Sequence, residues 1–120
     1  MERLKISVAM TTYNGGRFLE EQLESIFHQT MLPSEVVVID DGSNDNTISI
    51  LDNYSKSHNL KYYVNAEHLG INKNFEKAIR MTSGDIVFIS DQDDVWLKNK
   101  IGVMVEAAVK KYIDSYLFNL

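Results

Sequence analysis

Cysteine is absent from this chain of 120 residues, and several other features are scarce. Without cysteine the protein forms no disulfide and offers no thiolate to a metal ion. Proline occurs once, and the chain shows no internal repeat and no low-complexity segment. No apolar run reaches the roughly 18 residues of a membrane-spanning helix, and the opening MERLKISVAM lacks the apolar core of a signal peptide.

An excess of basic residues is also missing. The chain has 12 Lys and Arg against 17 Asp and Glu, which gives a formal net charge of -5. Nucleic-acid-binding proteins show the opposite balance, so nucleic acid is not an expected partner. Hydrophobic residues make up 44% of the chain, which is enough for one packed domain and too few residues for two. We therefore treat residues 1–120 as one domain.

Short apolar runs alternate with longer amphipathic stretches. The β-branched run within Glu35–Ile39 is typical of a central strand in a parallel sheet. From Arg17 to Gln29, apolar residues recur at spacings of one, three and four, which predicts a helix. We expect strands at 4–10, 35–39, 60–64 and 86–89, helices at 17–29, 70–82 and 97–112, a further helix after residue 46, and 113–118 as a candidate fifth strand.

This alternation predicts an α/β domain, a mostly parallel sheet with helices on both faces. In such sheets, ligands bind beyond the carboxyl ends of the strands. Three polar segments follow the first, second and fourth predicted strands, at residues 11–14, 40–43 and 91–94. The predicted topology brings all three segments to the same edge of the sheet, where we expect a ligand site.

The segment Asp91–Asp94 holds three carboxylates in four residues. Such carboxylates repel one another unless a cation or hydrogen-bond donors offset their charge. Oxygen-only ligands suit Mg²⁺ or Mn²⁺, and a Mg²⁺ site usually combines one or two carboxylates with substrate phosphates. A solvated acidic loop that caps the next helix explains the same residues. An EF-hand is excluded, because its glycine and closing glutamate are missing.

The other two polar segments suit a nucleotide. An aspartate at position 40 or 41 can accept a hydrogen bond from a base N–H or from ribose hydroxyls, although an ordinary Asp-Gly turn fits as well. Tyr13 can stack on a base, or can be a surface residue of a turn. No Gly-x-Gly-x-x-Gly or phosphate-loop lysine is present, so a metal would have to neutralise phosphate. The three histidines are predicted to be surface or loop residues: His28, His58 and His68.

The order and intervals of three segments carry a resemblance to a known family. TTYNGG at 11–16, DDGSND at 40–45 and SDQDDVW at 90–96 are similar to the N-terminal half of the family 2 glycosyltransferases. The last segment, with NFE at 74–76, looks most like bacterial rhamnosyltransferase-type members. The resemblance implies the A-type glycosyltransferase fold, a nucleotide-diphosphate sugar donor that is UDP- or dTDP-linked, and Mn²⁺ or Mg²⁺ as cofactor.

The resemblance also assigns roles to single residues by position. Tyr13 would stack on the nucleotide base, with Thr11 as a second base contact. Asp41, or alternatively Asp40, would accept a hydrogen bond from the base.

The acidic segment would hold the other part of the donor. Asp91 and Gln92 would lie near the donor ribose or sugar. Asp93 matches the metal-binding end of the family's Asp-x-Asp signature, with Asp91 as the second metal candidate. The family's catalytic base and acceptor-binding region lie beyond Leu120, so we expect this chain alone to transfer sugar weakly or not at all.

The implied activity is inverting, metal-assisted transfer of a sugar to a saccharide or lipid-linked acceptor. Two alternatives stay open, a truncated module that binds nucleotide or metal without turnover, and a nucleotidylyltransferase-like domain. The latter usually has a basic glycine-rich loop, whereas only Arg17 follows the first polar segment. An open sheet edge at a fifth strand would favour a homodimer. We expect a cytoplasmic location and leave open attachment at the inner face of the membrane.

Overall fold

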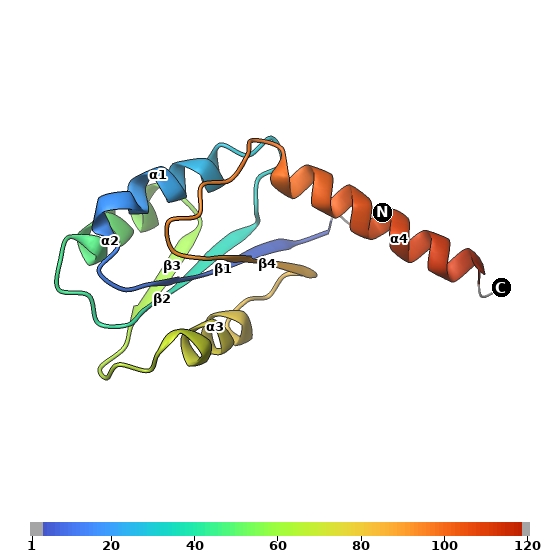
Figure 1. Cartoon of the computed structure of the whole chain (residues 1–120). Coiled ribbons are helices and arrows are strands. Elements are labelled where there is room, and N and C mark those ends of the chain that lie inside the picture. The colour runs from blue at the N-terminus through green and yellow to red at the C-terminus, as the bar shows by residue number, and fades with distance from the viewer. Residues whose placement is uncertain (1–3, 119–120) are drawn as a thin grey trace.

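Four parallel strands form one sheet in the computed structural model, which describes residues 4–118 (Figure 1). Their order across the sheet is β3-β2-β1-β4, and each neighbouring pair is parallel. The strands are β1 Ile6–Thr12, β2 Glu35–Asp40, β3 Leu60–Val64 and β4 Ile86–Ser90. The predicted α/β class with a parallel sheet is confirmed.

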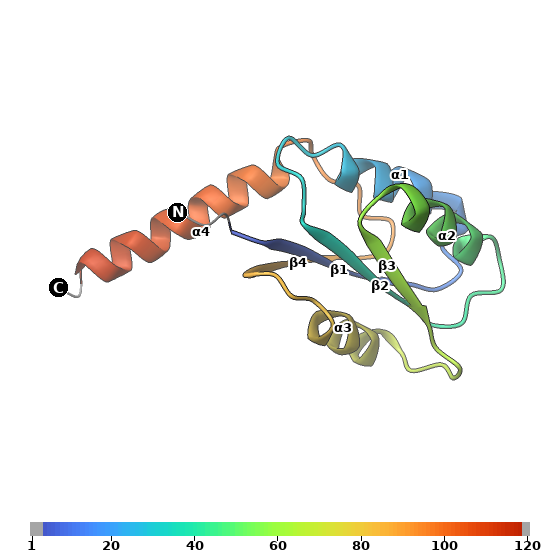
Figure 2. The ribbon, with the colours of Figure 1, turned by 180° about the vertical axis from the view of Figure 1, so that it is seen from behind.

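Helices cover both faces of this sheet, as predicted. Helices α1 and α2 pack on one face and α3 packs on the other, as two opposite views show (Figures 1 and 2). Helix α4 begins beside α1 and extends away from the sheet. The helices are α1 Gly16–Phe27, α2 Thr47–Ser57, α3 Ile71–Arg80 and α4 Lys100–Phe118.

Strands β1, β2 and β4 are largely apolar because each of the three contributes to two cores. Val36 and Val38 belong to the larger core, which α1 and α2 cover. Ile39 belongs to the smaller core, together with Ala9 of β1 and Ala78 of α3. Period-2 alternation along these three strands therefore buries apolar side chains on both faces of the sheet.

The strand order reverses next to β1, which is where open parallel sheets bind ligands. The chain runs from β1 through β2 to β3 on one side, and then crosses to β4 on the other. Thr12 lies opposite Asp40, and Met10 lies opposite Ser90. The segments after β1, β2 and β4 therefore start at the same edge, which confirms the predicted convergence.

The first strand is longer than the sequence predicts. Thr11 and Thr12 are predicted in a turn, but they pair with Ile39 and Asp40 and are buried. That prediction is wrong because β-branched side chains fit a paired strand well, and a partner strand is present here. The turn is instead confined to the residues that follow, where Asn14 takes a φ of 48°.

The prediction of a fifth strand at 113–118 is wrong, because these residues continue α4. A helix satisfies its backbone hydrogen bonds within the segment, whereas a strand requires a neighbour. Ile101 and Val105 of α4 are buried, but Tyr112 and Tyr116 on the same helical face are exposed. One apolar stripe therefore begins in the core and continues onto the surface. The homodimer stays a prediction, now based on this stripe rather than on a fifth strand.

The region around α4 contains a hollow that is separate from the polar segments. This hollow of about 810 Å³ lies between α4 and the residues Thr30 and Met31. These residues precede β2, so the hollow is at the amino edge of the sheet, away from the polar segments. Within residues 4–118, none of the helices is long and apolar enough to cross a membrane.

Candidate functional site

The loops that follow β1, β2 and β3 line a pocket of about 280 Å³ at the carboxyl edge of the sheet. This volume is close to the lower limit of about 300 Å³ for ligand pockets, so it suits a single ring system. Two predicted nucleotide-binding residues, Tyr13 and Asp41, meet here. The complete lining is Tyr13, Asp41, Gly42, Asn65, Ala66, Glu67 and His68.

The two predicted base contacts of the first segment differ in accessibility. Tyr13 is 46% exposed, so its ring can receive a stacked ligand. Thr11 lies within β1 and is 6% exposed, so its side chain offers little surface to a ligand. The structure therefore brings Tyr13 to the pocket and leaves Thr11 in the strand behind it.

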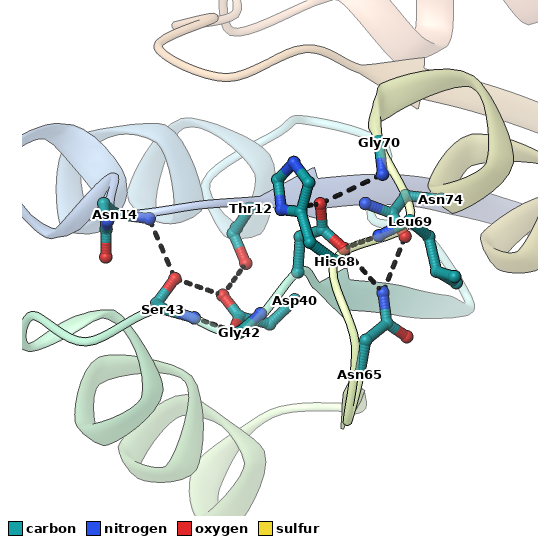
Figure 3. A network of polar contacts seen from close by, with 11 residues as sticks. Thr12, Asn14, Asp40, Gly42, Ser43, Asn65, His68, Leu69, Gly70 and Asn74 are labelled. Atoms are coloured by element: carbon teal, nitrogen blue, oxygen red, sulfur yellow. Dashed lines mark hydrogen bonds and ion pairs between the residues drawn. The ribbon is translucent and has the colours of Figure 1, made fainter.

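Asp40 is fully buried and shapes the loop between β2 and α2 (Figure 3). Its Oδ1 accepts hydrogen bonds from Thr12 Oγ1 at 2.7 Å and from Ser43 Oγ at 2.6 Å. Its Oδ2 accepts from the backbone N–H groups of Gly42 at 3.0 Å and Ser43 at 2.8 Å. Asp41 lines the pocket and Asp40 does not, so the geometry favours Asp41 over Asp40 as the ligand contact.

Asp41 ties the loop between β3 and α3 to the pocket. Its Oδ1 accepts from the Leu69 N–H at 2.8 Å and from Asn65 Nδ2 at 3.0 Å, and its Oδ2 accepts from the Gly70 N–H at 3.1 Å. Burial alone would raise the pKa of this carboxyl, but the donated hydrogen bonds lower the pKa to about 2. Asp41 is therefore a charged acceptor at neutral pH.

His68 completes the group around Asp41 (Figure 3). Its Nδ1 lies 2.7 Å from Asp41 Oδ2, and its side chain is 64% exposed. Its ring stands edge-on to Tyr13, with a centroid distance of 5.1 Å. The prediction of an exposed loop residue is confirmed for His68. The sequence does not reveal its contact with Asp41, because a lone histidine carries no spacing signal for a partner in another loop.

Gly70 has a backbone conformation that only glycine adopts readily. Its φ of 86° and ψ of 166° lie in a region where other residues cost about 1–3 kcal/mol. This conformation directs its N–H at Asp41. Among the described residues, no atom lies within 4 Å of a Cβ built on Gly70, so any cost of a side chain is conformational.

Gly70→Ala is therefore expected to lower the free energy of unfolding by about 1–2 kcal/mol. Urea unfolding measures the change. Gly102→Ala is the matched control, because Gly102 lies in α4, where alanine is the better residue and the nearest atoms are 3.9 Å from the new Cβ. It should be neutral or slightly stabilising. Equal effects of the two substitutions would contradict the conformational explanation.

The acidic segment Asp91–Asp94 follows β4 directly. Asp91, Gln92 and Asp93 are exposed, and Asp93 has a φ of 67°, which aspartate and asparagine tolerate better than most residues. Asp94 Oδ2 accepts a hydrogen bond from Trp96 Nε1 at 3.3 Å. Asp91 and Asp93 are therefore the carboxylates best placed for a cation.

Gln92 and Trp96 connect this segment to the rest of the domain. A Cβ built on Gly15 would lie 3.3 Å from Gln92 Cδ, so the Gln92 side chain reaches the turn between β1 and α1. Trp96 is buried, and its ring centroid lies 5.9 Å from that of Phe88. The sequence leaves Trp96 open as a lid or a core residue, and the structure places it in the core.

The donor set fits a cation that takes part of its coordination from a substrate. In the part of the chain that the structure describes, no three His, Cys, Asp or Glu side chains cluster as a metal site. Mg²⁺ is commonly bound by one or two carboxylates together with phosphates and water. Asp91 and Asp93, both exposed oxygen donors at a strand end, match this arrangement.

One polar face of α1 holds the residues that follow β4. Gln22, Ser25 and Gln29 are spaced by three and four, so they lie on one side of the helix and its continuation. We call these three residues the α1 clamp. Gln22 and Gln29 are 1% and 4% exposed, which the apolar pattern of α1 does not reveal. Buried amide side chains require partners, and residues 90–101 supply them through backbone groups and the Ser90 hydroxyl.

The contacts of the α1 clamp span the whole segment. They are Gln22 Nε2 to Ser90 Oγ at 2.9 Å and to Asp91 O at 2.6 Å, Trp96 N to Ser25 Oγ at 3.0 Å, Gln29 Nε2 to Leu97 O at 2.6 Å, and Ile101 N to Gln29 Oε1 at 3.0 Å. The clamp therefore fixes the backbone on both sides of the exposed carboxylates of Asp91 and Asp93.

Comparison with known proteins identifies the class to which this fold and site belong. The sequence model of Glycosyl transferase family 2 matches residues 7–119, so the chain belongs to this family. The resemblance stated from the sequence is thus confirmed, and so is the A-type glycosyltransferase fold.

Individual relatives add detail. The dTDP-rhamnosyl transferase RfbG of Shigella flexneri is 35% identical over 118 residues, which cover 92% of this chain and 40% of RfbG. The crystal structure of residues 1–349 of S. aureus TarS in complex with UDP superposes with a TM-score of 0.79 at 31% identity, covering 86% of this chain and 31% of that one. The mannosyltransferase PcManGT from Pyrobaculum calidifontis, in complex with GDP-Man and Mn²⁺, has a TM-score of 0.71 at 33% identity, covering 79% of this chain and 29% of that one. The chain therefore spans well under half of these relatives.

Proposed function

We propose that this chain is the donor-binding part of a glycosyltransferase that moves a sugar from a nucleotide-diphosphate donor to a saccharide or lipid-linked acceptor. One observation carries the proposal. The pocket around Tyr13 and Asp41 and the exposed carboxylates of Asp91 and Asp93 share one sheet edge, next to the reversal in strand order. The pocket suits a nucleotide base, and the carboxylates suit a metal-bound diphosphate.

The pocket favours a base that presents a ring N–H. When Asp41 is charged, its carboxylate accepts hydrogen bonds and cannot donate one. Uracil, thymine and guanine each carry a ring N–H beside a carbonyl group, whereas cytosine and adenine present a bare ring nitrogen. The names of the relatives contain UDP, dTDP and GDP-Man, which have these three bases. In the proposal, the base stacks on Tyr13 and donates to Asp41.

Asp93 and Asp91 would hold Mn²⁺ or Mg²⁺ together with the diphosphate of the donor. A bound ion would offset the negative charge that develops on the departing diphosphate. Gln22 donates a hydrogen bond to the backbone carbonyl of Asp91 and so helps to position the carboxylates for the ion. Gln92, which reaches the turn before α1, would lie near the donor ribose or sugar.

Transfer with inversion also requires a base that takes the proton of the acceptor hydroxyl, on the side opposite the leaving diphosphate. We assign this catalytic base to a part of the full-length enzyme outside residues 1–120, since the chain spans 40% of RfbG. On its own, the chain is expected to bind the donor and to transfer sugar weakly or not at all. We also propose that the protein is cytoplasmic and attaches to the inner membrane face if its acceptor is lipid-linked.

Calorimetric titration with UDP, dTDP and GDP, each with and without Mn²⁺, tests this proposal. We expect one nucleotide to bind more tightly with Mn²⁺, and Asp93→Asn to weaken Mn²⁺-dependent binding about tenfold or more. Asparagine is chosen because it tolerates the positive φ of Asp93. Asp85→Asn, at an exposed aspartate before β4, is the control and should bind as the wild type does. Failure of the folded wild-type chain to bind any of the three nucleotides would refute the proposal.

A further inference from the structure

The carboxylate of Asp41 has no acceptor position to spare. Leu69 N and Asn65 Nδ2 donate to Oδ1, Gly70 N donates to Oδ2, and His68 Nδ1 lies 2.7 Å from Oδ2. A carboxylate offers about four lone-pair positions. A base N–H can therefore reach Asp41 only if one of these four partners gives way.

Three of the four partners are fixed by the fold. Leu69 and Gly70 contribute backbone amides at the start of α3. Asn65 is buried, and its side chain also donates to Asn74 Oδ1 at 2.7 Å and accepts from Lys77 Nζ at 2.9 Å. Displacing any of these three would open the loop between β3 and α3.

His68 is different, because its side chain is 64% exposed and can rotate into solvent without breaking the loop. Its ring also stands against Tyr13, the aromatic residue of the same pocket. One side chain therefore contacts both groups that a base would use, the acceptor Asp41 and the stacking surface of Tyr13.

We propose that His68 is a displaceable gate of the base pocket, and that a uridine or thymidine diphosphate binds by replacing its imidazole at Asp41. The inference rests on the proposed function and adds a regulatory residue to the same site. The base N–H and His68 Nδ1 compete for Asp41 Oδ2, so part of the binding free energy is used to displace the imidazole. Removal of the imidazole should therefore strengthen nucleotide binding.

Calorimetric titration of the whole chain with UDP in the presence of Mn²⁺ tests the gate. His68→Ala is expected to bind UDP about three- to tenfold more tightly than the wild type, which is the net contribution of one typical hydrogen bond. The matched control is His28→Ala. His28 is 69% exposed and its Nδ1 lies 3.0 Å from Glu24 Oε2, so it has the same kind of contact outside the pocket. This control should bind UDP as the wild type does.

Two further measurements separate competition at Asp41 from simple obstruction. His68→Phe keeps a ring beside Tyr13 but has no Nδ1, so it should tighten UDP binding as His68→Ala does. Uridine diphosphate methylated at N3 has no ring N–H to give to Asp41, so His68→Ala should bring no gain with this probe. Thermal unfolding of each variant verifies that it is folded.

The outcomes distinguish the gate from the proposed function. If the wild type binds UDP and His68→Ala binds it equally or more weakly, the gate is refuted while donor binding stands. A gain with His68→Ala but not with His68→Phe, or an equal gain with the N3-methylated probe, also refutes competition at Asp41. If neither the wild type nor any variant binds UDP, dTDP or GDP, the proposed function fails and the gate fails with it.

Discussion

Asp41→Asn is expected to lower the free energy of unfolding by about 2–4 kcal/mol at pH 7 and to abolish UDP binding. Asparagine has one acceptor oxygen, so it cannot serve Leu69, Asn65 and Gly70 together. Its amide group would face a backbone N–H, and each buried donor left without an acceptor costs about 1–3 kcal/mol. Urea unfolding and calorimetric titration with UDP measure the two effects.

The same substitution should change how stability depends on pH. The pKa of Asp41 is lowered to about 2 from an ordinary value of 3.8, so the unfolded chain takes up the proton first on acidification. The stability that this carboxylate provides is present above about pH 4 and is lost as the pH falls through 2. The difference in unfolding free energy between the wild type and Asp41→Asn should shrink by about 2 kcal/mol between pH 5 and pH 2.

Asp85→Asn is the control for both measurements. Asp85 is exposed, and its Oδ2 accepts a hydrogen bond from the Lys5 N–H at the opposite edge of the sheet. Its substitution should leave UDP binding unchanged and alter stability by less than about 1 kcal/mol. Nucleotide binding by Asp41→Asn as tight as that of the wild type would remove Asp41 from the proposed site.

The second large effect is expected from Gln22→Leu. Leucine has a similar volume but cannot donate, so Ser90 Oγ and the carbonyl oxygen of Asp91 lose their partner. We expect the free energy of unfolding to fall by about 2–4 kcal/mol, since two buried or partly buried groups are affected. We also expect the Mn²⁺-dependent gain in UDP affinity to fall, because the backbone that carries Asp91 and Asp93 is no longer fixed.

Gln29→Leu separates the two parts of this prediction. Gln29 is also buried and also donates to a backbone carbonyl, that of Leu97, but it lies at the far end of the same segment. Its loss should destabilise the fold to a similar degree and leave the Mn²⁺-dependent gain intact. If both variants lose that gain equally, the effect of Gln22 on the metal is a consequence of lower stability.

Periodicity predicts much of this fold because local patterns coincide with burial. The segment Leu60–Val64 is a strand with the predicted bounds, and the run in Glu35–Ile39 is central in the sheet. The errors occur where a partner decides the outcome. Thr11 and Thr12 are strand residues because β2 lies beside them, and residues 113–118 are helical where the prediction assumes a neighbouring strand.

The site is predictable in its location and not in its contacts. Strand ends and residue types place Tyr13, Asp41 and Asp93 at one edge. The sequence cannot separate Asp40 from Asp41, because the two residues are identical and adjacent, and only their burial and partners in the fold distinguish them. His68 is missed for a related reason, since its partner is in a different loop.

The α1 clamp has a consequence for hydrogen exchange. Trp96 and Ile101 donate their amide protons to side chains of the clamp, and Thr30 donates to the Lys98 carbonyl beside it. These amides are protected only while α1 and residues 90–101 stay docked, so they should exchange with deuterium as one cooperative unit. Their common exchange rate would then report how often the segment that carries the acidic residues opens.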